Sequence, residues 1–274
     1  MSLPDHPRAV VTGAGSGLGR AFCVELAARG ARIVAADIDL AAAEETARLV
    51  AGAGGEAVVR RADVALAEDV EALAAEAERA FGGADLVVNN AGVAVGGPVG
   101  AVPLDDWKWI LGVNLWGVIH GCHTFVPRFK AQGSGHVLNV ASAAGLISGP
   151  GMGAYNVTKA GVVALSETLA AELAGTRVGV TVLCPTFFRT KIGESARDHT
   201  GRDTKRALHK LMDRARVQAP DVARFALAAA DHGDLYALPH ADGRWMWRAK
   251  RLAPAIFQKT LVPRVVAAGE RRLK

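Results

Sequence analysis

Residues 12–19 read Thr12-Gly13-Ala14-Gly15-Ser16-Gly17-Leu18-Gly19, directly after the apolar run Ala9–Val11. Glycines at these spacings let a backbone turn tightly and approach a pyrophosphate closely, while a following helix offers unpaired N–H groups to the anion. Such a turn is a weak signal by itself, because glycine-rich turns also merely connect elements. Its position between a strand pattern and a helix pattern predicts a dinucleotide site that includes Gly13, Ser16, Gly17, Leu18 and Gly19.

Beyond this turn, short apolar, β-branched runs alternate with longer amphipathic segments rich in Ala and Leu. The runs predict strands at Ala9–Thr12, Arg32–Ala36, Glu56–Arg60, Leu86–Asn89, His136–Val140, Val178–Leu183 and Leu235–Leu238. Helical patterns cover Gly17–Arg29, Leu40–Ala51, Ala67–Phe81, Asp105–Gln132, Ala154–Leu173, Thr204–Arg216 and Asp221–Ala230. Nearly continuous apolar strands between helices indicate a parallel sheet covered on both faces. The predicted fold class is α/β, with a single doubly wound, Rossmann-type domain.

The length of 274 residues and a hydrophobic fraction of 50% suit one large domain with an extensive core. We expect a dinucleotide-binding and catalytic domain at residues 1–240 and a C-terminal extension at residues 241–274. Charged residues or proline interrupt every apolar stretch well before the roughly 18 residues of a membrane span. The first strand pattern begins too early to leave room for an export signal, so we expect a soluble cytoplasmic protein.

The positive charge of the chain is concentrated in its C-terminal extension. Residues 244–274 hold nine Lys and Arg against one acid, Glu270, whereas the whole chain carries only +5, so the preceding 243 residues sum to −3. No nucleic-acid motif accompanies this basic segment, and we expect no nucleic-acid partner. Apolar residues alternate with its charges: Trp245, Trp247, Leu252, Ile256, Phe257, Leu261, Val265 and Val266. This amphipathic segment is expected to cover its own domain or a neighbouring subunit, and contact with an anionic membrane surface is the less favoured alternative.

Cysteine and histidine spacing argues against disulfides and metal. Cys23, Cys122 and Cys184 lie in apolar surroundings without paired spacing, which predicts buried reduced thiols. The eight histidines form no ligand cluster, so we predict no metal site.

Asp37 ends the second predicted strand, 20 residues after Gly17. An acid at this position can accept hydrogen bonds from a ribose 2′-OH, and its charge would repel a 2′-phosphate. We therefore predict NAD in preference to NADP. The alternatives are a helix-capping role for Asp37 and a methyltransferase that binds S-adenosylmethionine with a similar loop.

Tyr155 and Lys159 are spaced i, i+4 on the predicted helix Ala154–Leu173, so both side chains should share one face. An ammonium near a phenol stabilises the phenolate and lowers a pKa that is ordinarily near 10. Ser142 follows the fifth predicted strand at the sheet edge where doubly wound folds bind ligands. Each residue alone has an ordinary structural explanation, but together they predict an acid/base site for an alcohol or ketone.

These motifs together resemble the short-chain dehydrogenase/reductase family over about residues 7–240. The resemblance rests on the residue 12–19 turn, Asp63-Val64, Asn89-Asn90-Ala91-Gly92, Asn114, Ser142 and Tyr155-x-x-x-Lys159. It implies that Tyr155 is the acid/base, that Lys159 lowers its pKa and binds the nicotinamide ribose, that Ser142 orients the substrate oxygen, and that Asn114 supports a water linked to Lys159. It further implies cofactor contacts from Asp63, Val64, Asn90, Ala91, Gly92, Pro185 and Thr190. Thr186 departs from the glycine that usually follows this proline, which puts the local backbone shape in question.

The resemblance implies reversible hydride transfer between a nicotinamide and a secondary alcohol or ketone, in a homotetramer or dimer. Predicted substrate contacts are Ser142, Val93, Ala143, Met152, Phe187 and Phe188, and their apolar character favours a hydrophobic substrate. Residues 190–216 are a candidate lid. The alternatives are an NADP-dependent 3-ketoacyl-type reductase, which Asp37 disfavours, and a non-catalytic dinucleotide-binding regulatory protein, which would not need the catalytic set.

Overall fold

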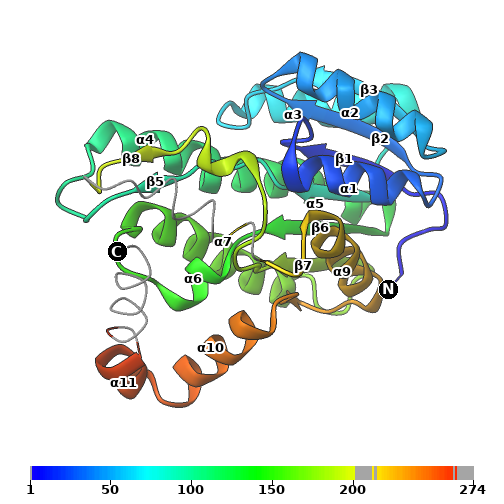
Figure 1. The fold of residues 1–274 in the computed structure, drawn as a ribbon. Coiled ribbons are helices and arrows are strands. Elements are labelled where there is room, and N and C mark those ends of the chain that lie inside the picture. Colours follow the sequence, from blue (N-terminus) through cyan, green and yellow to red (C-terminus); the bar gives the residue numbers. More distant parts are fainter. Residues whose placement is uncertain (1, 201–211, 213–214, 262, 264–274) are drawn as a thin grey trace.

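The computed structural model describes residues 2–200, 212, 215–261 and 263, and within them a seven-stranded parallel sheet has the order β3-β2-β1-β4-β6-β7-β9 (Figure 1). Its strands are β1 (Arg8–Thr12), β2 (Arg32–Asp37), β3 (Glu56–Arg61), β4 (Leu86–Asn89), β6 (Gly135–Val140), β7 (Val178–Leu183) and β9 (Tyr236–Ala237). The direction in which successive strands are added reverses between β1 and β4. Ligands of such sheets bind beyond the carboxyl ends of the strands at this point. The predicted doubly wound α/β fold is confirmed.

Helices cover both faces of the sheet. One face carries α1 (Gly17–Ala27), α2 (Leu40–Gly52) and α9 (Ala219–His232), and the other carries α3 (Ala67–Phe81), α5 (Gly117–Gln132) and α7 (Gly153–Glu172). Successive side chains of a strand point to opposite faces, so Val10 packs toward the α3 side while Val11 packs toward the α1 side. Both faces are therefore apolar, which explains the continuous hydrophobic runs.

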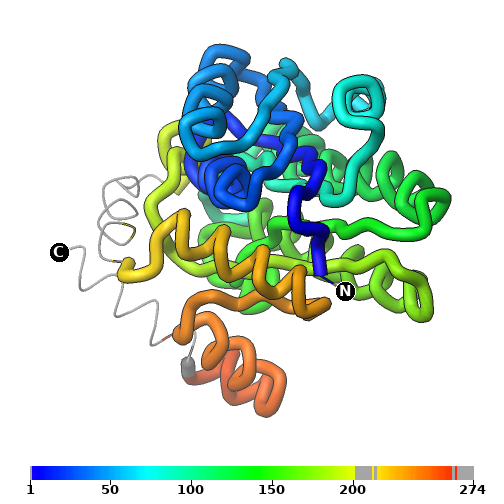
Figure 2. The backbone as a smooth tube through the Cα atoms, turned by 90° about the vertical axis from the view of Figure 1, so that its right-hand side faces the viewer, coloured from blue at the N-terminus to red at the C-terminus, as the bar shows by residue number. Residues whose placement is uncertain are grey.

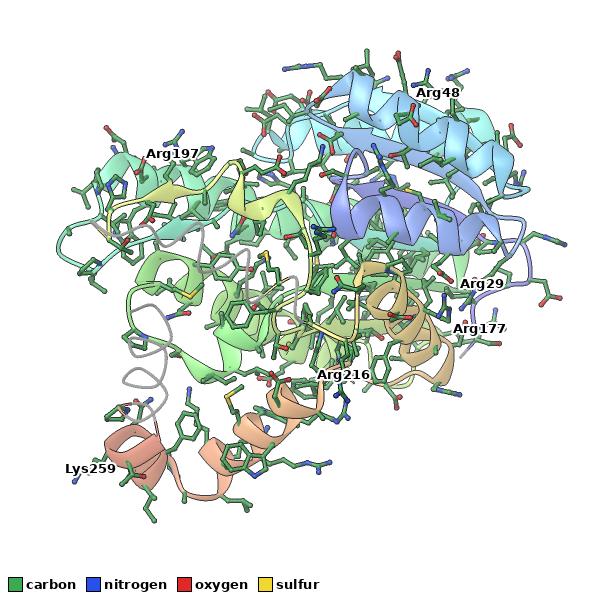
Figure 3. The ribbon with its side chains drawn as sticks, viewed as in Figure 1. Arg29, Arg48, Arg177, Arg197, Arg216 and Lys259 are labelled. Atoms are coloured by element: carbon green, nitrogen blue, oxygen red, sulfur yellow. The ribbon has the colours of Figure 1, made fainter. Side chains whose placement is uncertain are left out.

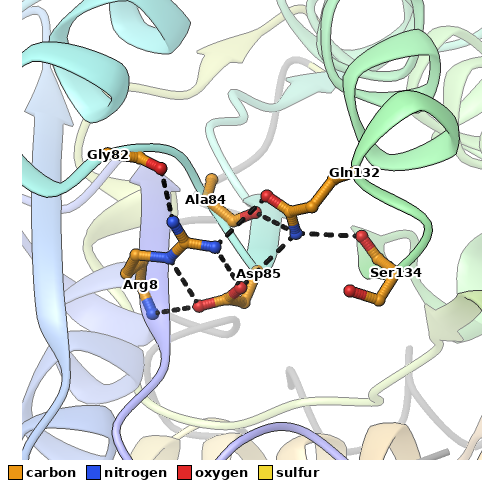
Figure 4. Close-up of polar contacts among 6 residues, drawn as sticks. All are labelled: Arg8, Gly82, Ala84, Asp85, Gln132 and Ser134. Carbon is orange, nitrogen blue, oxygen red and sulfur yellow. Dashed lines mark hydrogen bonds and ion pairs between the residues drawn. The ribbon is translucent and has the colours of Figure 1, made fainter.

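The amino ends of the strands are joined by a polar cluster opposite the ligand-binding edge (Figure 4). Arg8 donates hydrogen bonds from Nε and Nη2 to the carboxylate of Asp85 at 2.9 and 2.6 Å. Gln132 at the end of α5 donates to the carbonyl oxygen of Ala84 at 3.2 Å. The cluster ties β1, the approach to β4 and the end of α5 together, away from the chemistry.

The segment Asp105–Gln132 was predicted as one continuous helix, and its continuity is wrong. The segment forms α4 (Leu104–Leu111), a π-helical turn η1 (Gly112–Trp116) and α5. A π-helical turn adds one residue to the turn and re-aims the side chains within it, and such turns are frequent at functional sites. Asn114 lies in this turn and is fully buried. Hydrophobic periodicity does not register a single inserted residue, so the sequence could not predict the interruption.

Four short elements on the ligand side were not predicted, because two to five residues are too few for a pattern. They are β5 (Val95–Gly96), α6 (Ala143–Ile147), the 3₁₀ turn η2 (Lys191–Gly193) and β8 (Arg197–Asp198). β5 and β8 pair in parallel as a separate small sheet. Most of the predicted helix Thr204–Arg216, much of the candidate lid, and Val265 and Val266 lie outside the described residues.

The C-terminal extension begins with α10 (Ala241–Leu252), followed by α11 (Pro254–Ile256) and the π-helical turn η3 (Phe257–Leu261). Figures 1 and 2 both show these elements, in orange to red, along one end of the molecule, and α10 contacts α6. Among the described residues no helix is both long and apolar enough to cross a bilayer. The three cysteines are buried and free, as predicted.

Candidate active site

The glycine-rich turn connects the end of β1 to the start of α1. Gly13 has φ +65°, and a Cβ atom there would lie 2.8 Å from Cα of Ala91. A Cβ on Gly19 would lie 2.0 Å from the carbonyl oxygen of Gly13, a distance no side chain tolerates. Glycine at both positions lets α1 begin directly against the turn. The helix N-terminus therefore adjoins the turn, where the spacing predicts that an anion binds.

Ser16 and Leu18 lie in different environments at the start of α1. Ser16 occupies the N-cap position of α1, and its side chain makes no capping hydrogen bond. A free hydroxyl at a helix N-terminus is suited to a phosphate oxygen. Leu18 is 7% exposed and belongs to the core on the α1 side of the sheet.

The segment after β4 is joined to the same turn through Thr12. Its Oγ1 atom accepts hydrogen bonds from the backbone N–H groups of Asn90 and Ala91 at 3.0 and 3.1 Å. The Asn90 side chain donates to the carbonyl oxygens of Thr12 and Gly13 at 2.8 and 3.2 Å. These bonds hold the carboxyl ends of β1 and β4 in register. The pattern Asn89–Gly92 predicted this region, whereas the role of Thr12 was missed.

Asp37 lies at the end of β2 with its carboxylate directed to the turn. Oδ2 accepts from the Gly15 N–H at 2.8 Å, and Oδ1 accepts from the Asp39 N–H at 2.9 Å. The N-cap of α2 is Asp39, whose side chain accepts from the N–H of Ala42. Asp37 is therefore not a helix cap, and its charge lies beside the glycine-rich turn.

Arg20 and Thr46 stabilise the outer side of the turn and were missed by the sequence analysis. Arg20 donates to the Gly15 carbonyl oxygen at 2.6 Å and to Oγ1 of Thr46 at 3.0 Å. Thr46 in turn donates to the Ala14 carbonyl oxygen at 2.8 Å. Arg20 directly follows the glycine pattern, but its partner on α2 is 26 residues away and leaves no local signal.

Asp63 and Val64 follow β3 on the side of the crevice next to β2. The Asp63 carboxylate accepts from the Ala65 N–H at 3.0 Å, and the Asp63 N–H donates to Asp69 at 2.7 Å. Val64 is buried, and its carbonyl oxygen lies 2.9 Å from Nδ1 of His120. The pair forms a fixed wall at the edge of the sheet.

The chain after β7 faces the turn from the other half of the sheet. Thr190 is the N-cap of η2, where its side chain accepts from the Ile192 N–H. A Cβ on Gly17 would lie 3.6 Å from Cβ of Thr190, so the two residues are neighbours across the mouth of α1. The carbonyl oxygen of Pro185 accepts from the Ala143 N–H at 2.9 Å. Both predicted residues of this segment thus lie at the ligand edge.

Thr186 does not distort the backbone after Pro185. Among the described non-glycine residues, only Ser148 has a positive φ. The Thr186 hydroxyl donates to Oδ1 of Asp242 on α10 at 3.2 Å. The side chain that departs from the usual glycine therefore contacts the C-terminal extension.

Ser142 and Tyr155 meet where α6 and α7 begin. Ser142 is the N-cap of α6, and its Oγ atom accepts from the Ala144 N–H at 3.1 Å. The Ser142 side chain is also close enough to the phenol of Tyr155 to lower the pKa of that phenol. Tyr155 lies in the first turn of α7. Two residues that are 13 apart in the chain thus place their hydroxyl groups together.

Lys159 lies one turn further along α7 and is 3% exposed. Its Nζ atom donates to the carbonyl oxygen of Val140 at 2.8 Å. Gly145 makes this packing possible, because a Cβ there would lie 2.5 Å from the backbone of Lys159. Sequence periodicity did not identify Gly145, whose requirement comes from α6 crossing α7.

Asn114 joins the site from the π-helical turn. Its side chain accepts from the Val93 N–H at 2.8 Å and donates to the Val93 carbonyl oxygen at 2.9 Å. A Cβ on Gly92 would lie 3.3 Å from Oδ1 of Asn114 and 3.7 Å from Nζ of Lys159. Asn114 and Lys159 therefore both lie beside Gly92, at the carboxyl edge of the sheet.

Burial dominates the electrostatics of this site. It raises the pKa of Tyr155 to about 12, against a smaller lowering by the hydrogen bond with Ser142. It also lowers the pKa of Lys159 to about 8. The groups of the chain alone thus do not give the phenol the lowered pKa that the resemblance implies. A positive charge bound over the site would oppose the effect of burial.

The predicted substrate residues occupy different environments. Val93 packs with Tyr155 in a small apolar cluster that also includes Val95, Ile110 and Ala154. Ala143 is buried behind Ser142, and Met152 pairs with Gly97 just before α7. Phe187 is 45% exposed, whereas Phe188 is 7% exposed, lies in the core on the α1 side and stacks on His240. Phe188 therefore has a packing role.

The small β5–β8 sheet is held by a charged cluster centred on Asp106, which the sequence analysis missed. The carboxylate of Asp106 contacts Nη1 of Arg197 at 2.6 Å and Nε2 of His199 at 2.5 Å. The Arg197 guanidinium also stacks 3.8 Å from the ring centroid of Trp109. Figure 3 shows Arg197 beside α4, far from the labelled Lys259 of the extension. The cluster fixes the start of the candidate lid against α4, and Asp106 has a lowered pKa because of Arg197 and then His199.

The arrangement offers proton transfer next to an open anion-binding turn. It contains the phenol of Tyr155, the ammonium of Lys159 and the hydroxyl of Ser142, which can hold a substrate oxygen. Among the described residues no group of three His, Cys, Asp or Glu side chains could hold a metal ion.

The chain is similar in sequence and in structure to known dehydrogenases. Residues 7–201 match the family described as short chain dehydrogenase. The chain is 36% identical over 225 residues to an oxidoreductase named SadH from Mycobacterium tuberculosis, covering 81% of this chain and 82% of that protein. It is 38% identical over 217 residues to a D-threitol dehydrogenase from Mycolicibacterium smegmatis, covering 79% and 82%. A short-chain dehydrogenase/reductase from Burkholderia phymatum, solved in complex with NAD, is 37% identical with a TM-score of 0.88, covering 93% of this chain and 96% of that one.

Proposed function

Because the chain belongs to the short-chain dehydrogenase/reductase family, and is thus an NAD(P)-dependent oxidoreductase acting on alcohols, we propose that it transfers a hydride reversibly between NAD(H) and a hydrophobic secondary alcohol or ketone. The observation that carries this proposal is the meeting of Ser142 and Tyr155 beside the buried Lys159. A protein that only bound a dinucleotide would have no need for all three groups.

The cofactor fits the residues present, because the glycine-rich turn leaves the N-terminus of α1 open where any Cβ on Gly13 or Gly19 would collide. The residues that would hold it are those of the turn, Asp37, Asn90, Thr190 and Lys159. When bound, the nicotinamide accepts or donates the hydride, and its oxidised form brings a positive charge.

Tyr155 is the proposed acid/base. In alcohol oxidation the carbon loses its hydride and the hydroxyl proton passes to the phenolate of Tyr155, and ketone reduction runs these transfers backward. Ser142 holds the substrate oxygen against the phenol. Lys159 supplies positive charge that stabilises the phenolate, and Asn114 keeps Gly92 and Val93 in place beneath it.

NAD is the proposed cofactor because Asp37 places a carboxylate beside the turn. A 2′-phosphate there would meet like charge, whereas a ribose hydroxyl could donate to the carboxylate. The related NAD complex supports this preference. An NADP-dependent 3-ketoacyl-type reductase remains the competing assignment.

The proposed substrate is hydrophobic because Tyr155 adjoins the apolar cluster of Val93, Val95, Ile110 and Ala154. The related D-threitol dehydrogenase acts on a polyol according to its name, so polyols belong in the same substrate screen. We also propose a homo-oligomer, a tetramer or a dimer. Trp116 and Val157 are 53% and 50% exposed on the contacting elements η1 and α7, an apolar surface suited to a second copy.

The test is a titration of NADH and NADPH by fluorescence, followed by a screen of secondary alcohols, ketones and polyols. Wild type should bind NADH more tightly and turn over at least one apolar secondary alcohol. Tyr155→Phe should retain NADH binding and lose turnover by about a thousandfold, within the usual contribution of acid/base catalysis. Turnover by Tyr155→Phe equal to that of wild type would refute the assigned acid/base.

A further inference from the structure

The start of α10 contacts the chain segment that follows β7. The Thr186 hydroxyl donates to Asp242 at 3.2 Å, and the Thr186 N–H donates to Nδ1 of His240 at 3.3 Å. The backbone of α10 lies so close to the Thr186 side chain that a Cβ on Gly243 would lie 2.9 Å from Cγ2 of Thr186. The first turn of α10 therefore holds Thr186 on both its backbone and its side chain.

The residue before Thr186 contacts the catalytic serine directly. The Pro185 carbonyl oxygen accepts from the Ala143 N–H at 2.9 Å and lies 3.5 Å from the Ser142 hydroxyl, which donates to it. A shift of this carbonyl would change the acceptor that the Ser142 proton faces. The position of the first turn of α10 is thus transmitted to Ser142 through two successive residues.

The far end of α10 contacts the other end of the serine's helix. Nζ of Lys250 donates to the carbonyl oxygen of Leu146 at 2.7 Å. Leu146 lies in the last turn of α6, where carbonyl groups lack partners within the helix and attract a cation. Burial lowers the pKa of Lys250, so this ammonium is partly withdrawn from water. Since α6 has only five residues, its ends depend on contacts from outside the helix.

We propose that α10 is a positioning element for the proposed reaction, in which Asp242 and Lys250 hold the two segments that aim the hydroxyl of Ser142. The proposal rests on the function proposed above and assigns the C-terminal extension a role in that reaction. The residues of α10 act through Pro185 and α6, without touching substrate. Loss of either contact lets α6 shift relative to Tyr155, which impairs proton transfer more than it impairs cofactor binding.

The decisive variant is Lys250→Met, which keeps the length of the side chain and removes its donor. Arg248→Met is the matched control, because it removes the same charge from an exposed residue of the same helix. Lys250→Arg restores a donor and should recover most of the loss. Asp242→Ala tests the other end of α10 independently, should Lys250→Met fold poorly.

Each variant is characterised in two ways. Kinetic and binding assays give kcat, KM and the NADH dissociation constant, and amide hydrogen exchange is measured for residues 143–147. We expect Lys250→Met to lower kcat about fivefold, the size of one lost hydrogen bond, with the NADH dissociation constant unchanged. Exchange of the α6 amides should rise in the same variant and stay at the wild-type rate in Arg248→Met. Asp242→Ala should show the same pattern.

Unchanged kcat in Lys250→Met overturns the proposal, even if exchange rises, because the contact is then only structural. A fall in kcat without faster exchange in α6, or an equal fall in Arg248→Met, overturns it too. Tyr155→Phe, run alongside, tests the oxidoreductase assignment separately. If wild type turns over no substrate, the oxidoreductase assignment fails, whereas an active wild type with unchanged kcat in Lys250→Met overturns the positioning role alone.

Discussion

The Nζ atom of Lys159 lies 5.8 Å from the ring centroid of Tyr155, while its hydrogen bond runs to the carbonyl oxygen of Val140 at 2.8 Å. The ammonium is thus fixed by the end of β6 and influences the phenol through space. Because Lys159 is buried and Tyr155 is partly buried, water screens their charges poorly. Burial opposes ionisation of each, which makes the positive charge of Lys159 important to the phenolate.

Lys159→Met should shift the pH dependence of alcohol oxidation to higher pH. The proposed oxidation requires the phenolate, whose formation burial opposes and the positive charges of Lys159 and bound NAD favour. Removing a neighbouring ammonium raises the pKa of the phenol further, so the rising limb of kcat against pH moves upward by at least one unit. The measurement is kcat at saturating NAD from pH 6 to 10.5. Lys159→Arg, which keeps the charge, should shift the limb less. An unmoved limb in Lys159→Met would show that the lysine does not act on the phenol.

Asp37→Ser should change cofactor preference. A serine hydroxyl can still accept from the Gly15 N–H, but it carries no charge to repel a 2′-phosphate. We expect the ratio of the NADPH to NADH dissociation constants to fall about tenfold or more, corresponding to about 1.4 kcal/mol. Fluorescence titration of both cofactors measures it. Asp39→Ser, at the true cap of α2, is the control and should leave the ratio unchanged. A wild-type preference for NADPH would refute the assigned role of Asp37.

Asp106→Asn should weaken substrate binding while sparing the cofactor site. The substitution removes the charge that holds Arg197 and His199, and with them the chain that enters the candidate lid. We expect KM for the alcohol to rise about threefold, as befits a partly exposed ion pair, with an unchanged NADH dissociation constant. Asp105→Asn, at an 88% exposed side chain of the same helix, is the matched control. Equal KM values in wild type and Asp106→Asn would exclude a role for the cluster in substrate binding.

His136 should make the fold less stable in acid. It is buried in β6, its Nε2 atom lies 2.9 Å from Oγ1 of Thr181, and burial lowers its pKa from 6.5 to about 4. Between these values the unfolded chain binds a proton that the folded chain does not, so the free energy of unfolding decreases as pH falls from 6.5 to 4, by about 3 kcal/mol at most. Urea unfolding at several pH values measures this slope.

His136→Gln should flatten that slope, since glutamine does not titrate. His232→Gln is the control, because His232 is exposed at the end of α9. Equal slopes in wild type and His136→Gln would assign the acid sensitivity to other groups.

The elements of the sheet were predictable because each strand and its helix form from local patterns. Tyr155 and Lys159 were predictable as a pair, since helical spacing alone places them on one face. The contact of Asp106 with Arg197 was not predictable, because 91 residues separate the two and neither has a distinctive neighbour. The same holds for Thr186 and Asp242, which lie 56 residues apart. The π-helical turn at Asn114 was not predicted, because one inserted residue leaves the apolar period of the helix nearly unchanged.

The amino-acid sequence by itself determined the order of the main strands and helices, the glycine turn after β1 and the residue types of the proposed acid/base site. These follow from interactions over a few residues, namely side-chain periodicity, the conformational freedom of glycine and the i, i+4 spacing of a helix. Only the tertiary structure decided which carbonyl oxygens hold Lys159 and Lys250, that Phe188 is core while Phe187 is exposed, and that burial raises the pKa of Tyr155. Those properties depend on which distant segments exclude water from a group, and that is settled only when the chain has packed.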